Sequence, residues 1–176
     1  MAKFTFNTNP GETIARELLI AYLNVGEKDE PEWAPIGKRV EDSSEEMDWS
    51  EETIQDIMGS TYTTLRKPTI TQTFDPLPLD AEDKVSQKIW QLAIYEQNAQ
   101  ALANMDMLIA HFYTSDSGKT LGSFAERYSA CAVRTTGLGG EGGGNIGMPI
   151  EVTYGGERSL GSVKREDGVV SFTEAA

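Results

Sequence analysis

The sequence predicts a mainly β fold: a sandwich or barrel of about seven or eight strands with one helix on its flank. Three observations support this fold class. Short segments rich in Thr, Val, Ile and aromatic residues recur along the chain. Helical spacing of apolar residues is confined to 81–97. Residues 148–174 alternate apolar and polar side chains between glycine-containing turn signals. A length of 176 residues fits a single domain, 1–176.

The first half of the chain supplies several strands. Residues 17–26 are an apolar run that ends in glycine and predict a buried strand. Residues 30–37 contain two prolines and predict an edge strand or an irregular segment. Residues 61–79 are rich in Thr, Tyr, Ile and Phe and predict a strand that turns at Pro68 and ends at Asp75.

Between these strands lies a long segment, residues 38–60, whose first part, 38–52, is polar and has no sustained apolar period. We expect a long early loop, within which 52–59 is compatible with a short strand or with a helical turn. Loops of this length inside a compact domain usually have a function. The acidic residues concentrate here, because 27–56 holds 12 acidic and three basic side chains. The segment is either a solvated loop or an interaction arm that repels its own copies until it docks.

A helix is predicted over 81–97. Asp80 can cap its first turn, and Asp83 suits the positive end of the helix dipole. Trp90 lies on the apolar side and is expected in the core. The residues that share the apolar face are Val85, Ile89, Leu92 and Ala93.

The second half of the chain is again strand-like. Residues 105–114 predict a strand, and 123–136 continue with unevenly alternating small and polar residues. A C-terminal β-meander is predicted over 148–174, with chain reversals at Gly155-Gly156 and at Asp167-Gly168.

Charge and composition exclude several classes of protein. The chain has 28 acidic and 15 basic residues and a net charge of −13, which argues against gripping nucleic acid through its phosphates. No apolar run is long enough for a membrane span, and the N-terminus lacks the apolar stretch of a secretory signal. The single cysteine, Cys131, forms no internal disulfide and is expected to be a small buried hydrophobe, as suits a reducing cytoplasm.

Two glycine motifs suggest nucleotide binding but lack its context. Residues 137–147, GLGGEGGGNIG, contain a G-x-G-x-x-G, yet the dinucleotide fingerprint needs a helix after its last glycine, and here a strand is predicted. We therefore expect a turn or packing loop, for which another subunit is a candidate neighbour. Gly118-Lys119-Thr120 lacks the earlier glycine of a phosphate-binding loop and reads as a hairpin turn.

No catalytic, cofactor-binding or metal-binding residues are predicted. His111 is the single histidine, so the chain cannot form a zinc site with two histidines, and it offers no set of several histidines from which a catalytic triad could be assembled. His111 is expected on a sheet face. The acids between Asp42 and Asp48 lack the spacing of a calcium loop. Trp49 stands in the acidic segment without a local core. It either folds back or anchors in the pocket of a partner.

Several segments together resemble the major tail proteins, or tail tube proteins, of long-tailed phages and prophages of Gram-positive bacteria. The resemblance spans nearly the whole chain. The segments that carry it are EWAPIGKRVEDSSEEMDWSEETIQDIMG, TITQTFDPLPLD, the predicted helix, MLIAHFY, GGGNIGMPIEVTYGGERSLGSV and, most particularly, ERYSACAV followed by GLGGEGGGNIGMPI.

The resemblance implies a β-sandwich with a flanking helix that self-assembles as hexameric rings, stacked into a tube around a tape-measure protein. It implies tail-end or terminator proteins as further partners and a lumen through which DNA passes without specific binding. It also implies a virion protein that assembles in the host cytoplasm, binds no membrane, has no cofactor and is no enzyme. Residues 38–60 would form the inter-ring loop and 1–12 an N-terminal arm. Inter-subunit contacts are expected at Trp33, Val40, Met47, Trp49, Ile54, Gly142, Gly143, Gly144 and Asn145.

Three other classes stay open on the sequence. The chain could be another virion or prophage module, such as a head–tail completion protein, a decoration protein or the tube of a tail-derived bacteriocin. A small acidic binding module would instead be a stable monomer with a defined pocket. An enzyme fits least, and two buried carboxylates with raised pKa values in one cleft would be needed to support it.

Overall fold

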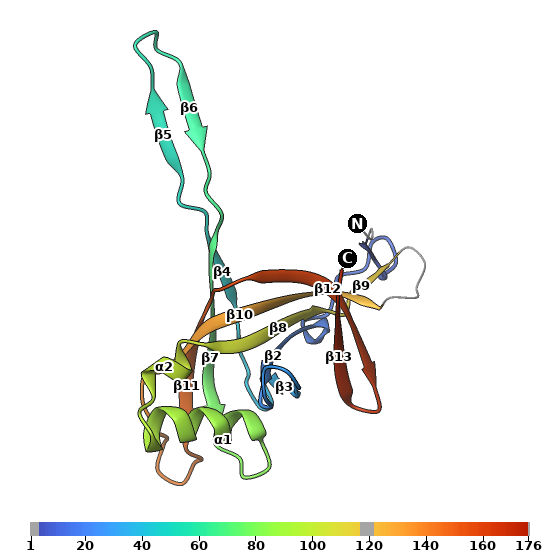
Figure 1. Ribbon diagram of the computed structural model, residues 1–176, viewed down its shortest axis with the longest axis vertical. Helices are drawn as coiled ribbons and strands as arrows, with labels where there is room; N and C mark the ends of the chain where they lie inside the picture. Colours follow the sequence, from blue (N-terminus) through green and yellow to red (C-terminus); the bar gives the residue numbers. More distant parts are fainter. Residues whose placement is uncertain (1–3, 117–121, 176) are drawn as a thin grey trace.

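A strongly curled sheet of nine strands dominates the structure (Figure 1). The computed structural model describes residues 4–116 and 122–175. The strand order is β3-β2-β8-β10-β11-β7-β4, and β12 and β13 join the sheet through β10. The strands are β2 (Leu19–Asn24), β3 (Trp33–Ile36), β4 (Glu45–Asp48), β7 (Thr69–Pro78), β8 (Met105–His111), β10 (Ser123–Thr135), β11 (Gly147–Tyr154), β12 (Arg158–Glu166) and β13 (Val169–Glu174).

Strand β10 allows the sheet to fold back on itself. Its first half pairs with β8 on one side and with β12 on the other, while its second half pairs with β11. The register shifts between Tyr128 and Cys131, which marks a bulge, and bulges bend a strand and increase its twist. In Figure 1, β8, β10 and β12 therefore run across the view, while β7 and β11 run close to the vertical. The mainly β fold class is confirmed.

Strands β11 and β12 do not pair with each other, so the predicted C-terminal meander is wrong in its first connection. Both strands pair antiparallel with β10, and Gly155-Gly156 forms a bend beside Ala130 rather than a reversal of the chain. A Cβ atom on Gly156 would lie 2.6 Å from the backbone nitrogen of Ala130. The second connection is as predicted, because β12 and β13 form a hairpin with Asp167 and Gly168 at positive φ in its turn.

The main core fills the space inside the curled sheet. Its largest fully buried side chains include Phe74 and Leu77 of β7, Met107 of β8 and Met148 of β11. A second apolar cluster joins β2, β3, β8 and β10 to the β12–β13 hairpin and includes Tyr22, Leu108 and Val163. Buried area of this kind is the dominant stabilising contribution to folding.

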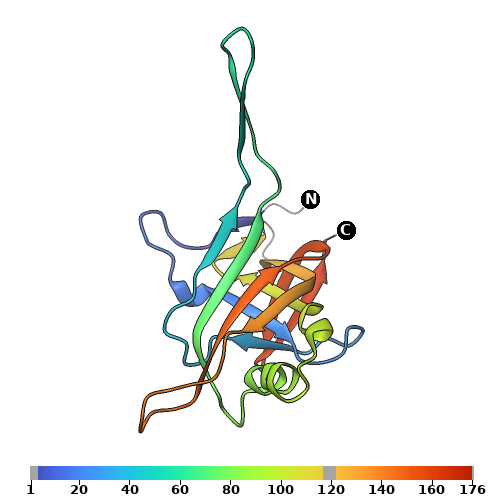
Figure 2. The same ribbon diagram turned by 90° about the vertical axis from the view of Figure 1, so that its left-hand side faces the viewer.

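The predicted helix forms and covers one end of the core, but it is shorter than 81–97. Helix α1 (Lys84–Trp90) continues directly into a π-helical turn, η2 (Gln91–Tyr95), and a short helix α2 (Ala99–Leu102) follows. The cap is Asp83 rather than Asp80, because the Asp83 carboxylate accepts hydrogen bonds from the first-turn backbone amides. Both views show these helices on one side of the sheet, away from β4 (Figures 1 and 2).

Val85 and Ile89 are fully buried, as their helical spacing predicts. Trp90 differs from the prediction. It is half-buried and stacks on Tyr95, with the ring centroids 6.4 Å apart. The tryptophan thus covers the outer side of the helix end instead of entering the core.

Strand expectations in the first half hold in part. Strand β2 is the predicted buried strand, and β3 is the predicted edge strand. Strand β7 runs past Asp75 and ends at Pro78, so Asp75-Pro76 does not end it. Residues 38–60, expected as a loop, contain β4 and a further strand, β5 (Glu52–Gln55). Short strands of this kind raise the strand number above the predicted seven or eight.

The remaining elements are small. Strand β1 (Phe4–Phe6) pairs with β9 (Thr114–Asp116), and a single 3-10 turn, η1 (Arg16–Leu18), precedes β2. The hairpin turn predicted at Gly118-Lys119-Thr120 lies outside the described residues.

Candidate subunit interface

The most prominent feature of the surface is a β-hairpin that projects from the sheet between β4 and β7 (Figures 1 and 2). We call residues 49–68 the arm. It consists of β5 paired with β6 (Thr61–Thr64), and this pair forms a separate two-stranded sheet. Eight residue steps separate Trp49 from Ile57, so the arm reaches roughly 25 Å beyond the body at about 3.3 Å per step.

The tip of the arm is held by its own hydrogen bonds. The Asp56 carboxylate accepts hydrogen bonds from the backbone amides of Met58, at 2.8 Å, and of Ser60, at 2.9 Å. The Asp56 amide donates to the Ser60 carbonyl, at 2.9 Å, and Gly59 supplies a positive φ of 82°. The backbone hydrogen bond from Ser60, followed by that from Met58, keeps the pKa of Asp56 below its ordinary value. The turn is therefore preorganised in the single chain.

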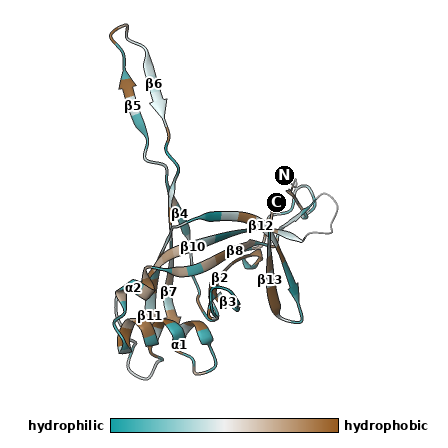
Figure 3. Ribbon diagram, viewed as in Figure 1, coloured by the Kyte–Doolittle hydropathy of each residue, from teal (hydrophilic) through white to brown (hydrophobic). Residues whose placement is uncertain are grey.

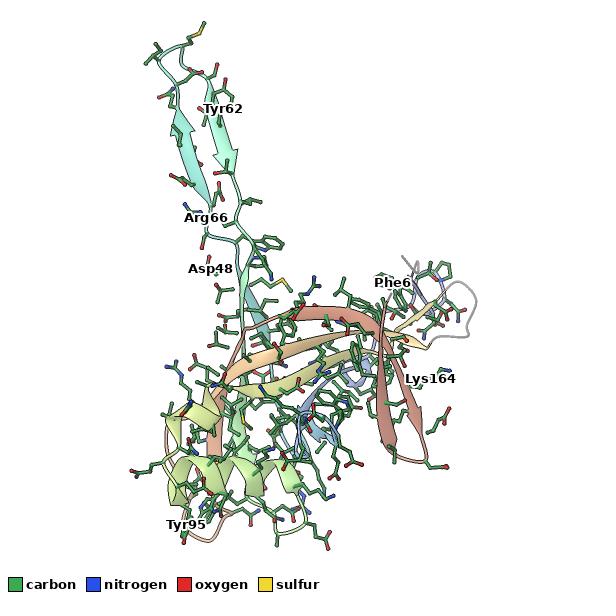
Figure 4. All side chains as sticks on the ribbon, in the orientation of Figure 1. Phe6, Asp48, Tyr62, Arg66, Tyr95 and Lys164 are labelled. Carbon is green, nitrogen blue, oxygen red and sulfur yellow. The ribbon has the colours of Figure 1, made fainter. Side chains whose placement is uncertain are left out.

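Apolar side chains on the arm point into solvent rather than into a core. Ile57 and Met58 at the tip are 106% and 87% exposed. Figure 3 shows hydrophobic residues at the end of β5 and at the tip, and Figure 4 shows Tyr62 extending from β6. An isolated two-stranded hairpin is marginally stable in water, and clustered exposed apolar residues mark interaction sites. The exposed apolar residues of β4 and the arm are Met47, Trp49, Ile54, Ile57, Met58, Tyr62 and Leu65.

The two strands of the arm differ in charge. The outgoing strand carries Glu51, Glu52 and Asp56, whereas residues 61–68 contain no acid. Arg66 forms an ion pair with Glu52, at 3.1 Å, across the hairpin. The outgoing side is therefore acidic, and the return side carries Thr, Tyr and Leu side chains together with the basic Arg66 and Lys67.

A groove lies on the body between β2, the segment that follows β3, β7 and the β12–β13 turn. Its volume is about 560 Å³. Ile36 and Phe74 on its lining belong to the main core, and Tyr22 and Val170 belong to the second cluster. The groove thus reaches the seam between the two apolar clusters. The charged residues around it are Arg16, Lys38, Arg165, Glu17 and Glu41.

The glycine-rich segment forms the loop between β10 and β11 and lines a second hollow, of about 570 Å³. Gly139 and Gly147 form an isolated β-bridge across it, and a Cβ atom on Gly140 would lie 2.2 Å from the Asn145 carbonyl oxygen. Strand β11 begins at Gly147, so the G-x-G-x-x-G is followed by a strand and not by the helix that a pyrophosphate site requires. This loop packs closely on itself, as glycine allows.

A buried polar cluster lies around Glu126 of β10 and His111, the last residue of β8. The Glu126 carboxylate bonds the His111 ring, at 3.0 Å, and accepts hydrogen bonds from Tyr128, at 3.0 Å, and from Arg158, at 2.6 Å. Burial alone would raise the pKa of Glu126, but the hydrogen bonds from His111, Arg158 and Tyr128 lower it to about 2. Burial raises the pKa of the nearby Glu45 carboxyl. The pKa values of the two carboxyls thus shift in opposite directions, and only that of Glu45 is raised.

A second ionic group fixes β2, β3, β8 and β10 to one another. Arg127 binds Asp106 through two hydrogen bonds, of 3.0 Å and 2.6 Å, and lies 5.7 Å from the centre of the Trp33 ring. Asn24 donates to the Asp106 carboxylate, at 3.5 Å, and accepts from the Glu32 amide, at 3.0 Å. These contacts hold Trp33 in the monomer.

The predicted contact residues fall in four places. Met47, Trp49 and Ile54 are exposed on β4 and the arm, with Trp49 48% exposed, so Trp49 does not fold back into a core. Val40 is half-buried and lines the groove. Trp33 is 8% exposed, which leaves little of its surface for a neighbour. The four residues predicted in the glycine loop are all exposed: Gly142, Gly143, Gly144 and Asn145.

Ile57, Met58, Tyr62 and Leu65 were not singled out from the sequence. Ile57 and Met58 stand in a polar turn, Asp56 to Ser60, where apolar side chains have no local core. That mismatch is the signal that could have identified them, as it did for Trp49.

The structure also bears on three other features: a reactive cysteine, a metal site and a membrane-spanning helix. Cys131 is fully buried, and burial raises the pKa of its thiol to about 12. Within residues 4–116 and 122–175, no group of three or more His, Cys, Asp or Glu side chains is placed to hold a metal ion. None of the described helices is long and apolar enough to cross a membrane.

The fold is similar to that of proteins from contractile injection systems. The sheath/tube terminator of the PVC extracellular contractile injection system aligns with a TM-score of 0.50 and 8% identity, over 86% of this chain and 99% of that chain. A chain of the PVC sheath-tube complex in its extended state aligns with a TM-score of 0.49 and 11% identity, over 88% of this chain and 95% of that chain. The tube terminating cap of the anti-feeding prophage aligns with a TM-score of 0.49 and 11% identity, over 89% of this chain and 95% of that chain.

At these identities the similarity concerns the fold. No protein-family model matches the chain, and no curated protein matches its sequence.

Proposed function

We propose that this chain is a structural subunit of a tail-type tube and that it assembles with copies of itself through the arm. The observation that carries the proposal is the arm: a preorganised hairpin that presents a row of apolar side chains to solvent. A monomer gains nothing from such exposure, whereas a neighbouring copy that covers these side chains removes their apolar area from water.

Three further features support assembly. The fold is similar to that of the sheath/tube terminator of the PVC extracellular contractile injection system, a component of a sheath and tube assembly. Strands β3 and β4 stand at the two ends of the strand order β3-β2-β8-β10-β11-β7-β4. Each is therefore an edge strand, and edge strands favour association with further strands. The arm and the β12–β13 turn point in opposite directions in Figure 1, which suits head-to-tail contacts that repeat along an axis.

In its finer form, the proposal is a tube of stacked hexameric rings in a phage virion, assembled in the host cytoplasm around a tape-measure protein and completed by tail-end proteins. DNA would pass through the lumen without specific binding. A net charge of −13 supports this passage, because a surface rich in carboxylates does not neutralise phosphates. The proposed role is structural, with no catalytic step and no cofactor.

Negative-stain electron microscopy of the purified protein, alone and co-expressed with its neighbouring genes, tests the proposal. Hollow tubes with stacked six-fold rings are expected in at least one condition. Single rings that never stack would instead indicate a terminator or a head–tail completion protein. Monomers in both conditions would reject the tube and favour a binding module.

A further inference from the structure

We infer that the groove between β2 and the β12–β13 turn is the receptor for the arm tip of a second copy of this chain. The inference rests on the proposed function and deepens it, because it assigns both halves of one inter-subunit contact. Ile57 and Met58 are the inserted side chains, and the groove receives them.

The tip has the properties of an anchor. Ile57 and Met58 are adjacent, exposed and apolar, and the hydrogen bonds of Asp56 fix the turn before any contact is made. These hydrogen bonds within the turn reduce the conformational entropy that the tip loses on binding. Anchors of this kind typically enter a pocket in the partner and dominate the binding energy.

The groove has the properties of a receptor for apolar side chains. Its lining offers the half-buried apolar side chains of Leu19, Ile20 and Val40, beneath which lie buried core residues of both clusters. A volume of about 560 Å³ is in the range of sites that enclose small ligands, which is ample for two side chains. The hollow of the glycine loop is similar in size, but neither apolar core cluster contributes to its lining.

Charge complementarity selects the arm as the occupant. Arg16, Lys38 and Arg165 stand around the groove against Glu17 and Glu41, so its surroundings are net positive on a chain of net charge −13. The arm carries Glu51, Glu52 and Asp56 against Arg66 and Lys67, so it is net negative, and its acidic residues lie on the outgoing side next to the tip. Opposite potentials of this kind fix register and steer encounter.

The directions of the two features require that the contact joins different copies. Figure 1 shows the arm extending from one end of the sheet, while the β12–β13 turn, which contributes Gly168 to the groove, points toward the other end. A tip that enters the groove of the next copy leaves its own groove open for the previous copy. The contact is therefore heterologous and repeats along one direction.

Disulfide cross-linking of assembled protein tests the inference. One chain carries both Ile57→Cys at the tip and Glu41→Cys at the groove, two exposed positions whose replacement leaves the core unchanged. The native Cys131 is fully buried, which keeps its thiol away from a cross-linking partner. Oxidation of assembled tubes is expected to give a ladder of covalent oligomers beyond the dimer. Each single variant gives dimers at most, and the matched control Ile57→Cys with Tyr95→Cys gives no ladder.

The outcomes separate the two proposals. Tubes of the double variant that yield no ladder, while the wild-type chain also forms tubes, would overturn the groove as receptor and leave the tube proposal standing. Failure of the wild-type chain to assemble in either condition would reject both. A charge reversal, Arg165→Glu, gives a second measurement. It is expected to raise the protein concentration needed for tube formation at least several-fold at low salt, with a smaller effect at high salt.

Discussion

The arm tip offers the sharpest test of the assembly model, through the substitution Ile57→Asp. Ile57 is 106% exposed and makes no core contact, so this change should leave the folded monomer intact. Surface substitutions away from packed or hydrogen-bonded features usually change the free energy of unfolding by no more than about 0.5 kcal/mol. The melting temperature of the monomer should therefore match that of the wild-type chain.

The effect on assembly should be large by comparison. Full burial of an isoleucine side chain contributes about 1.5–3 kcal/mol, and each subunit donates one such side chain to a neighbour. An aspartate in the same place forfeits that contribution and must also be desolvated. Since about 1.4 kcal/mol corresponds to a tenfold change in an equilibrium constant, the critical concentration for tube growth should rise roughly 10- to 100-fold.

The measurement is sedimentation of tubes over a series of total protein concentrations, with the soluble fraction at the plateau giving the critical concentration. Ile57→Leu is the matched control, because it keeps the apolar volume and should stay within about twofold of the wild-type value. A critical concentration for Ile57→Asp that equals the wild-type value, with normal tubes, would refute the anchor role of the tip.

Four further predictions follow from particular residues. Trp49→Ala should slow tube growth while leaving the monomer melting temperature unchanged, as light scattering and calorimetry can measure. Hydrogen exchange of the arm should be fast in the monomer and strongly slowed in tubes, because a lone two-stranded hairpin opens readily; equal protection in both states would contradict this. Glu126 has a pKa lowered to about 2, so its charged form stabilises the fold above about pH 4.5, and that contribution is lost as the pH falls toward 2. Glu126→Gln should therefore cost roughly 3 kcal/mol at pH 7 and progressively less below pH 4.5 in denaturation curves, and a pH-independent cost would count against the ionic cluster. Gly156→Ala should destabilise the monomer far more than Gly143→Ala, because both glycines have positive φ but the added Cβ clashes with Ala130 only at Gly156.

Local sequence patterns were sufficient where neighbouring residues decide the structure. The apolar run of β2, the proline-containing edge strand β3 and the Asp-Gly turn of the last hairpin follow from rules that act over a few residues. The helix was also found from its apolar spacing, although its start was placed three residues early, because Asp80 and Asp83 are both acceptable caps. The exclusion of a dinucleotide site likewise needed only the strand that follows the glycines.

Strand partners could not be obtained in the same way. Gly155-Gly156 has the composition of a hairpin turn, but its conformation is set by the bulge in β10, which lies more than twenty residues away in the sequence. Pairing across such distances depends on which apolar faces meet in the core, and a one-residue shift in register exchanges the two faces of a strand.

The same distinction between local sequence pattern and tertiary contacts applies to the candidate interface. The sequence by itself determined that an acidic, polar segment with an unaccommodated tryptophan interrupts the early strands, and composition alone identified that segment as a candidate contact. The tertiary structure decided that the segment is a projecting hairpin, that Ile57 and Met58 stand at its end, and that Trp33 belongs to the monomer core. The reason is physical. Composition reports whether a side chain prefers water, whereas exposure depends on which other elements reach that side chain, and only the folded sheet fixes those distances.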